Sequence, residues 1–369
     1  MRITWAQALS WRLRRQFLAS DGGSTGSPAT VGEVVGRLGA LPAWSGDPEY
    51  AVRIRQGEGA AGTVDRSLRD GTLVRVFAFR GATHLMTPDS AAVHLPLRAA
   101  GRMWERQSWQ DFYHLAPGDW PELRTAVREA VADGPLTLPG LADTVTADRR
   151  YAHLREHLSE AGTFLKPFFW QGDLCFGPSL DGQPTVQALA DNSRWPGLPD
   201  LDDAGREAVT GYLSAYGPAT PDRVHYWLGE GLGAGRKRIR GWLADLADRL
   251  TEVEVDGEPA LVPTHLAEDL AAAEPTDEVR LLTGHDQWAL GPGTADTAVV
   301  PPTIRAAVTR GANLVTVGGV VSGTWKVTGS HFTVTWADGG GASPSRVEEE
   351  VARVGRLLGK ELEPRQADG

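Results

Sequence analysis

The chain has 369 residues, of which 41% are hydrophobic and 23% are charged, so it resembles a globular protein with room for two to four domains. One cysteine, Cys175, excludes a disulfide framework and a cysteine-rich zinc site, and the lack of a signal peptide or a membrane-length apolar run favours the cytoplasm with no membrane partner. The net charge is −10, but residues 1–110 carry 14 Lys and Arg against 9 Asp and Glu, while the other 259 residues carry 23 against 38. A basic N-terminal third suits local contact with phosphates, although chance also produces such an asymmetry.

The first predicted element is an N-terminal helix over Ile3–Leu18. Its apolar residues Trp5, Leu9, Leu13 and Phe17 recur every four positions and would lie on one face. The Gly- and Ser-rich stretch Asp21–Ser27 is typical of a flexible link between this helix and the next element.

Three segments of the chain read almost alike. They are Ser27-Pro-Ala-Thr-Val-Gly-Glu-Val, Gly134-Pro-Leu-Thr-Leu-Pro-Gly-Leu and Gly217-Pro-Ala-Thr-Pro-Asp-Arg-Val. In each copy a proline breaks the preceding element and a threonine (Thr30, Thr137 or Thr220) can accept a hydrogen bond from a free helix N–H. The repeat predicts three short helices, each entered by a tight turn as in a helix-turn-helix.

Each copy is followed by a predicted hairpin with an X-Gly turn. The strands Leu73–Phe79, Thr163–Trp170 and Thr251–Val255 run into Arg80-Gly81, Gln171-Gly172 and Asp256-Gly257. The spacing from threonine to glycine is 35 residues in the second copy, 37 in the third and 51 in the first, which predicts an insertion over Leu41–Glu49. Helices are expected at Ala60–Leu68, Pro121–Ala132, Tyr151–Ala161, Asp203–Tyr216 and Ala234–Leu250.

The pattern changes beyond about Glu278, where short strands separated by glycine turns are expected. The predicted strands are Val279–Leu282, Trp288–Leu290, Ala298–Val300, Leu314–Val317, Val320–Val327 and His331–Trp336, followed by a helix over Ser345–Leu362. The sequence thus predicts an α+β protein with three tandem winged helix-turn-helix units, at 1–110, 111–183 and 200–268. A small β-barrel-like domain or strongly twisted sheet (278–338) and a C-terminal helix (343–364) would complete it.

Several segments together resemble the AlkZ/YcaQ-like winged-helix DNA glycosylases of bacteria. The segments are Trp11–Leu18, Val76–Leu85, Phe164–Pro167, Gly172–Gly177, Tyr216–Thr220, Arg280–Gly291, Val300–Pro302 and Val321–Trp325. The resemblance implies three winged helices around a DNA-binding cleft, and a C-terminal hairpin that can approach the duplex. Some members of that family unhook or excise bulky alkylated bases.

The resemblance also implies a catalytic Gln-x-Gln or Gln-x-Asp motif, whose two functional positions here are Pro42 and Trp44. Hydrolysis of an N-glycosidic bond needs a positioned water and a group that stabilises positive charge on the sugar. Proline offers neither, and an indole only donates a hydrogen bond. The catalytic residues therefore stay unassigned in the sequence.

Three substitutes for the missing glutamines are considered. Asp47 or Glu49 could supply a carboxylate, or could simply belong to a solvated turn. His84 could lie at the floor of the cleft, or could be a core histidine. The adjacent pair His285-Asp286 would alternate across a strand and favours a structural turn.

No cofactor or metal site is predicted. The one ligand-like spacing among the nine histidines is His153/His157, an i,i+4 pair that is more simply interpreted as two solvated side chains.

Two basic clusters are candidates for contact with DNA phosphates, alongside an aromatic residue and a hairpin tip. The full set of DNA-binding candidates is Arg12, Arg15, Trp44, Arg80, Arg236, Lys237, Arg238, Arg240, Gly318 and Gly319. Trp44 could stack on a base or could fill a hydrophobic gap.

Three functional hypotheses remain open from the sequence alone. The chain could be a glycosylase-like monomer that recognises or excises damaged bases in double-stranded DNA. It could also be a non-catalytic regulator or lesion binder, or its cleft could take a small molecule or a protein.

Overall fold

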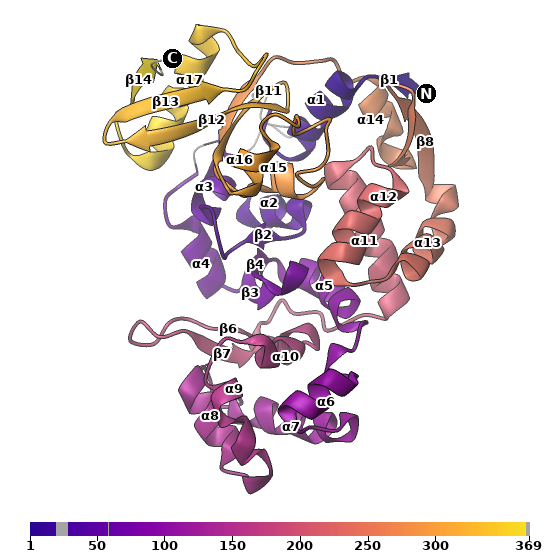
Figure 1. Ribbon diagram of the computed structural model, residues 1–369, viewed down its shortest axis with the longest axis vertical. Helices are drawn as coiled ribbons and strands as arrows, with labels where there is room; N and C mark the ends of the chain where they lie inside the picture. The colour runs from indigo at the N-terminus through magenta and orange to yellow at the C-terminus, as the bar shows by residue number, and fades with distance from the viewer. Residues whose placement is uncertain (20–28, 58, 367–369) are drawn as a thin grey trace.

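The computed structural model describes residues 1–19, 29–57 and 59–366, and it combines helices with three separate β-sheets (Figure 1). The predicted link Asp21–Ser27 and the first two residues of the first copy, Ser27 and Pro28, lie outside the described residues. The α+β class is confirmed. No helix among the described residues is long and apolar enough to cross a bilayer.

All three predicted threonine caps are confirmed. Thr30 accepts from the Glu33 amide at 3.2 Å and begins α2 (Val31–Leu38), and Thr137 accepts from the Gly140 amide at 3.2 Å and begins α8 (Leu138–Thr146). Thr220 accepts from the Arg223 amide at 3.3 Å and begins α12 (Pro221–Val224). Each hydroxyl satisfies one of the amides that a helix leaves free at its start. We call residues 30–86, 137–188 and 220–263 the first, second and third repeats.

Further helices surround these three. They are α1 (Trp5–Arg15), α3 (Pro48–Arg53), α4 (Thr63–Arg69), α5 (Pro88–Ala99), α6 (Gln107–Tyr113), α7 (Trp120–Ala130), α9 (Arg155–Leu158), α10 (Lys166–Trp170), α11 (Leu201–Tyr216), α13 (Arg236–Asp245) and α14 (Ala267–Ala271). The helix expected over Tyr151–Ala161 is instead a 3₁₀ segment, Arg149–Leu154, that leads into α9. The expected insertion in the first repeat contains a short strand, β2 (Leu41–Pro42), and leads into α3.

The hairpins of the first and third repeats are confirmed, and that of the second is displaced. β3 (Val74–Phe77) pairs with β4 (Thr83–Met86), and β8 (Leu250–Val255) pairs with β9 (Glu258–Pro263). The strand predicted at Thr163–Trp170 is wrong, because this segment is helical and buries its aromatic side chains in the main core. The second hairpin pairs β6 (Leu174–Phe176) with β7 (Thr185–Ala188).

Sheet pairing brings together segments that are far apart in the sequence. One six-stranded sheet has the order β2-β4-β3-β6-β7-β5, with β5 at Leu136–Thr137, and so merges the first and second repeats. β1 (Arg2–Ile3) pairs in parallel with β8, so the start of the chain lies against the third repeat (Figure 1).

The C-terminal region is an open five-stranded sheet rather than a closed barrel. Its strands are β10 (Val279–Leu282), β11 (Asn313–Val317), β12 (Val320–Thr328), β13 (His331–Trp336) and β14 (Glu363–Gln366), in that order. The segment predicted as strand Trp288–Leu290 belongs to the one-turn helix α15 (Gln287–Leu290), and Ala298–Val300 forms turns. α16 (Arg305–Thr309) precedes β11, and α17 (Pro344–Leu358) packs against β10 and α3 and ends at Gly359, which has φ 63°.

A buried ion pair connects the first repeat to this C-terminal sheet. Nη2 and Nη1 of Arg55 donate to the two carboxylate oxygens of Asp286 at 2.7 and 2.9 Å, and both side chains are fully buried. Asp286 also accepts from the Trp288 amide at 2.7 Å and so begins α15. The pair is bidentate, which is the strongest geometry for such a contact.

The substitution Asp286→Ala should lower the free energy of unfolding by about 3–5 kcal/mol, because it leaves the Arg55 charge buried without a partner. Urea unfolding followed by tryptophan fluorescence measures the change. Glu122→Gln is the matched control, since Glu122 pairs with Arg150 at the exposed surface and should leave the urea midpoint almost unchanged. Equal midpoints for both variants would contradict the structural role of the buried pair.

Candidate functional site

A cavity of about 190 Å³ lies where the first repeat, the third repeat and the C-terminal region meet. The first repeat contributes Trp44 from the loop after β2, and Arg80 and His84 from the β3–β4 hairpin; the third contributes Tyr226 from a π-helical segment, His225–Glu230. His285 and Gln287 border it from the C-terminal region. The walls are therefore mainly aromatic, with a few polar side chains, as is usual for ligand sites.

Trp44 forms an exposed wall of this cavity. Its side chain is 49% exposed, and its ring centroid lies 4.8 Å from that of His285. His285 adopts φ 58° and shares a hydrogen bond of 2.7 Å between its Nδ1 and the hydroxyl of Ser45. Of the two roles open for Trp44, the structure excludes the core plug and leaves a surface on which a planar group can stack.

His84 lies beside the position of the missing glutamine. It pairs directly with Pro42 across β2 and β4, and paired residues in antiparallel strands point to the same face. Its Nδ1 lies 3.0 Å from the Ala82 carbonyl oxygen, and its ring packs on Phe79. Burial lowers the pKa of His84 to about 4, although the bond to Ala82 acts in the opposite direction.

The two carboxylate candidates, Asp47 and Glu49, are both engaged as helix caps, which disfavours a catalytic role. Asp47 accepts from the Tyr50 amide at 2.9 Å and caps α3, while Glu49 accepts from the amides of Thr63 and Val64 at 3.0 Å each, at the start of α4. Both serve helix N-termini, where negative charge is favourable, and neither borders the cavity.

The N-terminal basic cluster is also directed away from DNA. Arg12 is fully buried and donates from Nε to the Gly217 carbonyl at 3.4 Å, and burial lowers its pKa. Arg15 donates to the Ser214 carbonyl at 3.1 Å, and Gln16 to that of Ala215 at 3.0 Å. These side chains of α1 satisfy the free carbonyls at the end of α11, where cations are stabilising. The expectation of a phosphate contact is wrong for Arg12, which is fully buried, and Arg15 is partly exposed but already bonded to the Ser214 carbonyl.

The second basic cluster lies at the surface. Arg236, Lys237, Arg238 and Arg240 are exposed at the start of α13, although Arg236 pairs with Asp222 at 2.7 Å. Arg80 is exposed as well, with its guanidinium 4.9 Å from the ring centroid of Tyr226 at the cavity. These positions remain compatible with phosphate contact.

Two cations missed by sequence reasoning, Arg98 and Lys166, complete this basic surface. The Nη2 of Arg98 and the Nζ of Lys166 lie within 4 Å of the point where a Cβ on Gly81 would stand. Burial lowers both pKa values, and for Lys166 the nearby Arg98 charge lowers it further. No carboxylate among the described residues forms an ion pair with either. Lys166 lies within Phe164–Pro167, a segment that carries the family resemblance, but only the fold brings it to Arg98.

The predicted hairpin tip at Gly318-Gly319 exists but does not face a duplex. The Gly319 carbonyl accepts from Nε1 of Trp288 at 2.8 Å, and a Cβ on Gly319 would stand 3.0 Å from the Cβ of Leu9. The tip is packed between α1 and α15, so its assignment as a DNA contact is wrong.

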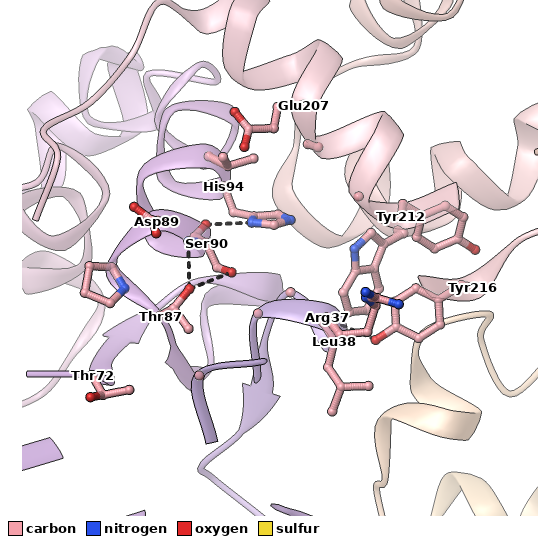
Figure 2. Close-up of a pocket in the computed structure, with 18 of the residues that line it drawn as sticks. Arg37, Leu38, Thr72, Thr87, Asp89, Ser90, His94, Glu207, Tyr212 and Tyr216 are labelled. Atoms are coloured by element: carbon pink, nitrogen blue, oxygen red, sulfur yellow. Dashed lines mark hydrogen bonds between the residues drawn. The ribbon is translucent and has the colours of Figure 1, made fainter. Parts of the chain in front are cut away.

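A second hollow, of about 460 Å³, lies between α2, α5 and α11 (Figure 2). Two of its polar side chains bond to the protein itself: His94 Nδ1 lies 2.7 Å from the Ser90 carbonyl, and the Tyr216 hydroxyl donates to the Leu38 carbonyl at 2.8 Å. We place the functional site at the smaller Trp44 cavity, because it combines an exposed indole with the exposed Arg80.

Metal and thiol chemistry receive no support from the described residues. They contain no group of three or more His, Cys, Asp or Glu arranged to hold a metal ion. His157, one of the predicted pair, packs its ring 4.9 Å from that of Tyr113. Burial raises the pKa of the Cys175 thiol to about 12, so it is not a ready nucleophile.

An aromatic cavity beside a basic surface, on helix-and-hairpin repeats, defines a class of nucleic-acid-binding proteins. The family model described as "DNA glycosylase AlkZ-like" matches residues 35–357. An interstrand DNA cross-link repair glycosylase from Streptomyces sahachiroi is 35% identical, over 97% of this chain and 98% of the relative. The solved structure of Streptomyces sahachiroi DNA glycosylase AlkZ superposes with a TM-score of 0.91 at 34% identity, covering 100% of both chains.

The chain therefore belongs to the AlkZ-like DNA glycosylase family. It is a DNA-binding, DNA-glycosylase-like protein of DNA repair, as the resemblance implied.

The pKa values of His84 and His94 should both be near 4, because both rings are buried, against about 6.5 for an ordinary histidine. The unfolded chain then binds protons that the native state does not, so stability should fall as the pH falls from about 6.5 to 4. A histidine NMR titration, assigned with His84→Gln and His94→Asn variants, measures the two midpoints. Midpoints above pH 6 for both rings would contradict their burial as neutral imidazoles.

Proposed function

We propose that the chain is a repair glycosylase that acts as a cytoplasmic monomer on duplex DNA, with three winged-helix units at 1–110, 111–183 and 200–268. The support for three units is the threonine-capped helix of each repeat and the hairpin that follows it. In this proposal the β domain (278–338) closes the cavity from the other side, and the C-terminal helix, expected over 343–364 and observed as α17, packs behind it on β10 and α3.

The observation that carries the proposal is the unneutralised basic surface beside the cavity. Arg98 and Lys166 are partly desolvated and close together at Gly81, and Arg80 of the same hairpin borders the cavity. Like charges held together without a carboxylate are unfavourable in the free protein, and a DNA phosphate would relieve the repulsion.

The substrate class that we propose is DNA with a bulky alkylated base, including interstrand cross-links. The named relative repairs interstrand cross-links, and it aligns with this chain over nearly the full length of both. The exposed Trp44 indole offers a stacking surface for a large planar adduct.

A second candidate is lesion binding without excision. It is favoured by Pro42 and Trp44, since neither side chain can accept a hydrogen bond from a water at the positions of the family motif. A cleft that takes a small molecule or a protein instead is disfavoured by the basic surface, which suits a polyanion.

Lys166→Gln and Arg98→Gln should each weaken binding to duplex DNA about equally for all sequences, and should reduce the salt dependence of log Kd by about one. Fluorescence anisotropy of a labelled duplex across a series of salt concentrations measures both effects. Arg155→Gln is the matched control, because Arg155 is already paired with Asp143. If all three variants keep the slope of the unmodified chain, the basic surface is not the DNA site.

The unmodified chain should release the modified base from a duplex that contains an N7-alkylguanine, leaving an abasic site. Alkaline cleavage of an end-labelled strand detects that site, with an unmodified duplex as the control. Salt-sensitive binding without abasic product would select the lesion-binding candidate. Absence of binding even at low salt would reject both DNA candidates.

A further inference from the structure

We propose that His84 is a catalytic residue that accepts a hydrogen bond from the water that attacks the deoxyribose carbon during base release, and so holds that water in place. This inference rests on the proposed glycosylase function and assigns a residue to its hydrolytic step. Four points lead to it: the register of β2 and β4, the tautomer of the His84 ring, the acceptors that remain at the cavity, and the alkylated base as the leaving group.

The strand register places His84 at the reactive face. β2 and β4 pair Pro42 with His84, and the Ala43 amide continues the ladder by donating to the Thr83 carbonyl at 3.0 Å. Trp44 lies two residues after Pro42, in the loop that follows β2. Both His84 and Trp44 border the same cavity.

One hydrogen bond fixes the tautomer of the His84 ring. The Ala82 carbonyl only accepts, so Nδ1 carries the proton and donates to it at 3.0 Å. The other nitrogen, Nε2, then has a free lone pair, and no hydrogen-bond partner for it exists among the described residues. A pKa near 4 keeps the ring neutral at pH 7, so that this lone pair is available.

Three other acceptors near the cavity already have hydrogen-bond partners, and a fourth has none. Asp47 and Glu49 cap helices, and Nδ1 of His285 shares its bond with Ser45. Gln287 donates from Nε2 to the Ala40 carbonyl at 2.6 Å, and its Oε1 is buried without a partner. A buried acceptor without a donor is where proteins commonly hold a water. His84 and Gln287 thus each keep an acceptor for water, as do the hydroxyls of Tyr226 and Thr294. The tautomer of His84 is fixed by the Ala82 carbonyl, whereas that of His285 depends on whether Nδ1 or Ser45 donates.

The chemical step balances without a cofactor. One water proton is directed to Nε2 of His84, and the water oxygen forms a bond to C1′ of the sugar as the C1′–N bond breaks. The electron pair of that bond moves to the alkylated base, which is cationic before cleavage and leaves neutral. The new C1′ hydroxyl loses its extra proton to solvent, and the His84 ring stays neutral throughout, in keeping with its pKa of about 4.

The test compares His84→Asn, His84→Gln and His94→Asn in single-turnover base release from the N7-alkylguanine duplex, with duplex affinity measured in parallel. Asn retains a donor at the place of Nδ1 but removes the acceptor at Nε2, whereas Gln reaches the place of Nε2. His94 is the matched control, because it is equally buried and packs on the same Phe79, but it bonds to Ser90 and borders the other hollow (Figure 2).

We expect His84→Asn to slow release by about 100-fold or more with unchanged affinity. His84→Gln should slow release by less than about 10-fold, and His94→Asn should not slow it. Urea midpoints check folding, and if His84→Asn does not fold, His84→Met makes the same comparison with an apolar side chain. If His84→Asn or His84→Met releases the base at the rate of the unmodified chain, the role of His84 is overturned but the proposed glycosylase function is not. No release by the unmodified chain, with duplex binding retained, would overturn both this role and the proposed excision.

Discussion

Arg55 and Asp286 form an ion pair from which water is excluded, and the shape of the candidate site depends on it. The pair joins the first repeat to the turn after β10, and Asp286 begins α15 with the same carboxylate. His285 and Gln287, on either side of Asp286, therefore stand against Trp44 and Ala40. A charged pair is costly to bury unless its geometry is good, so this contact allows little freedom in how the two parts meet.

The two arginine clusters show that local basic charge does not by itself indicate a nucleic-acid contact. Arg12 and Arg15 donate to carbonyls at the end of α11 and thereby attach the N-terminal helix to α11, which precedes the third repeat. Arg98 and Lys166 are isolated in the sequence, yet the fold brings them together at Gly81. Arg98 also donates to a carbonyl, that of Leu232 at 3.5 Å, so the difference lies in exposure: Arg12 is fully buried, whereas Arg98 and Lys166 are partly exposed.

If Pro42 and Trp44 occupy the positions of the family motif, as the resemblance implies, the cavity still offers the elements that our proposal needs. An exposed indole replaces a hydrogen-bonding side chain at one position, and a neutral histidine on the paired strand offers an acceptor beside the other. Trp44, in the loop after β2, then provides the stacking surface, and His84, on β4, provides the hydrogen-bond acceptor. Both lie next to a basic surface suited to phosphates.

The sequence by itself determined the features that depend on near neighbours. The three threonine caps act over three residues, and the Arg80-Gly81 and Asp256-Gly257 turns connect adjacent strands, so both were predictable. The aromatic run at Thr163–Trp170 was misread because a short buried apolar segment fits a strand and a helix equally well. Only the tertiary structure decided the merged six-stranded sheet, the burial of Arg12 and Gly319, and the position of His84 at the cavity. Each of these depends on contacts between segments that lie tens to hundreds of residues apart in the sequence. Local sequence patterns carry no information about such contacts.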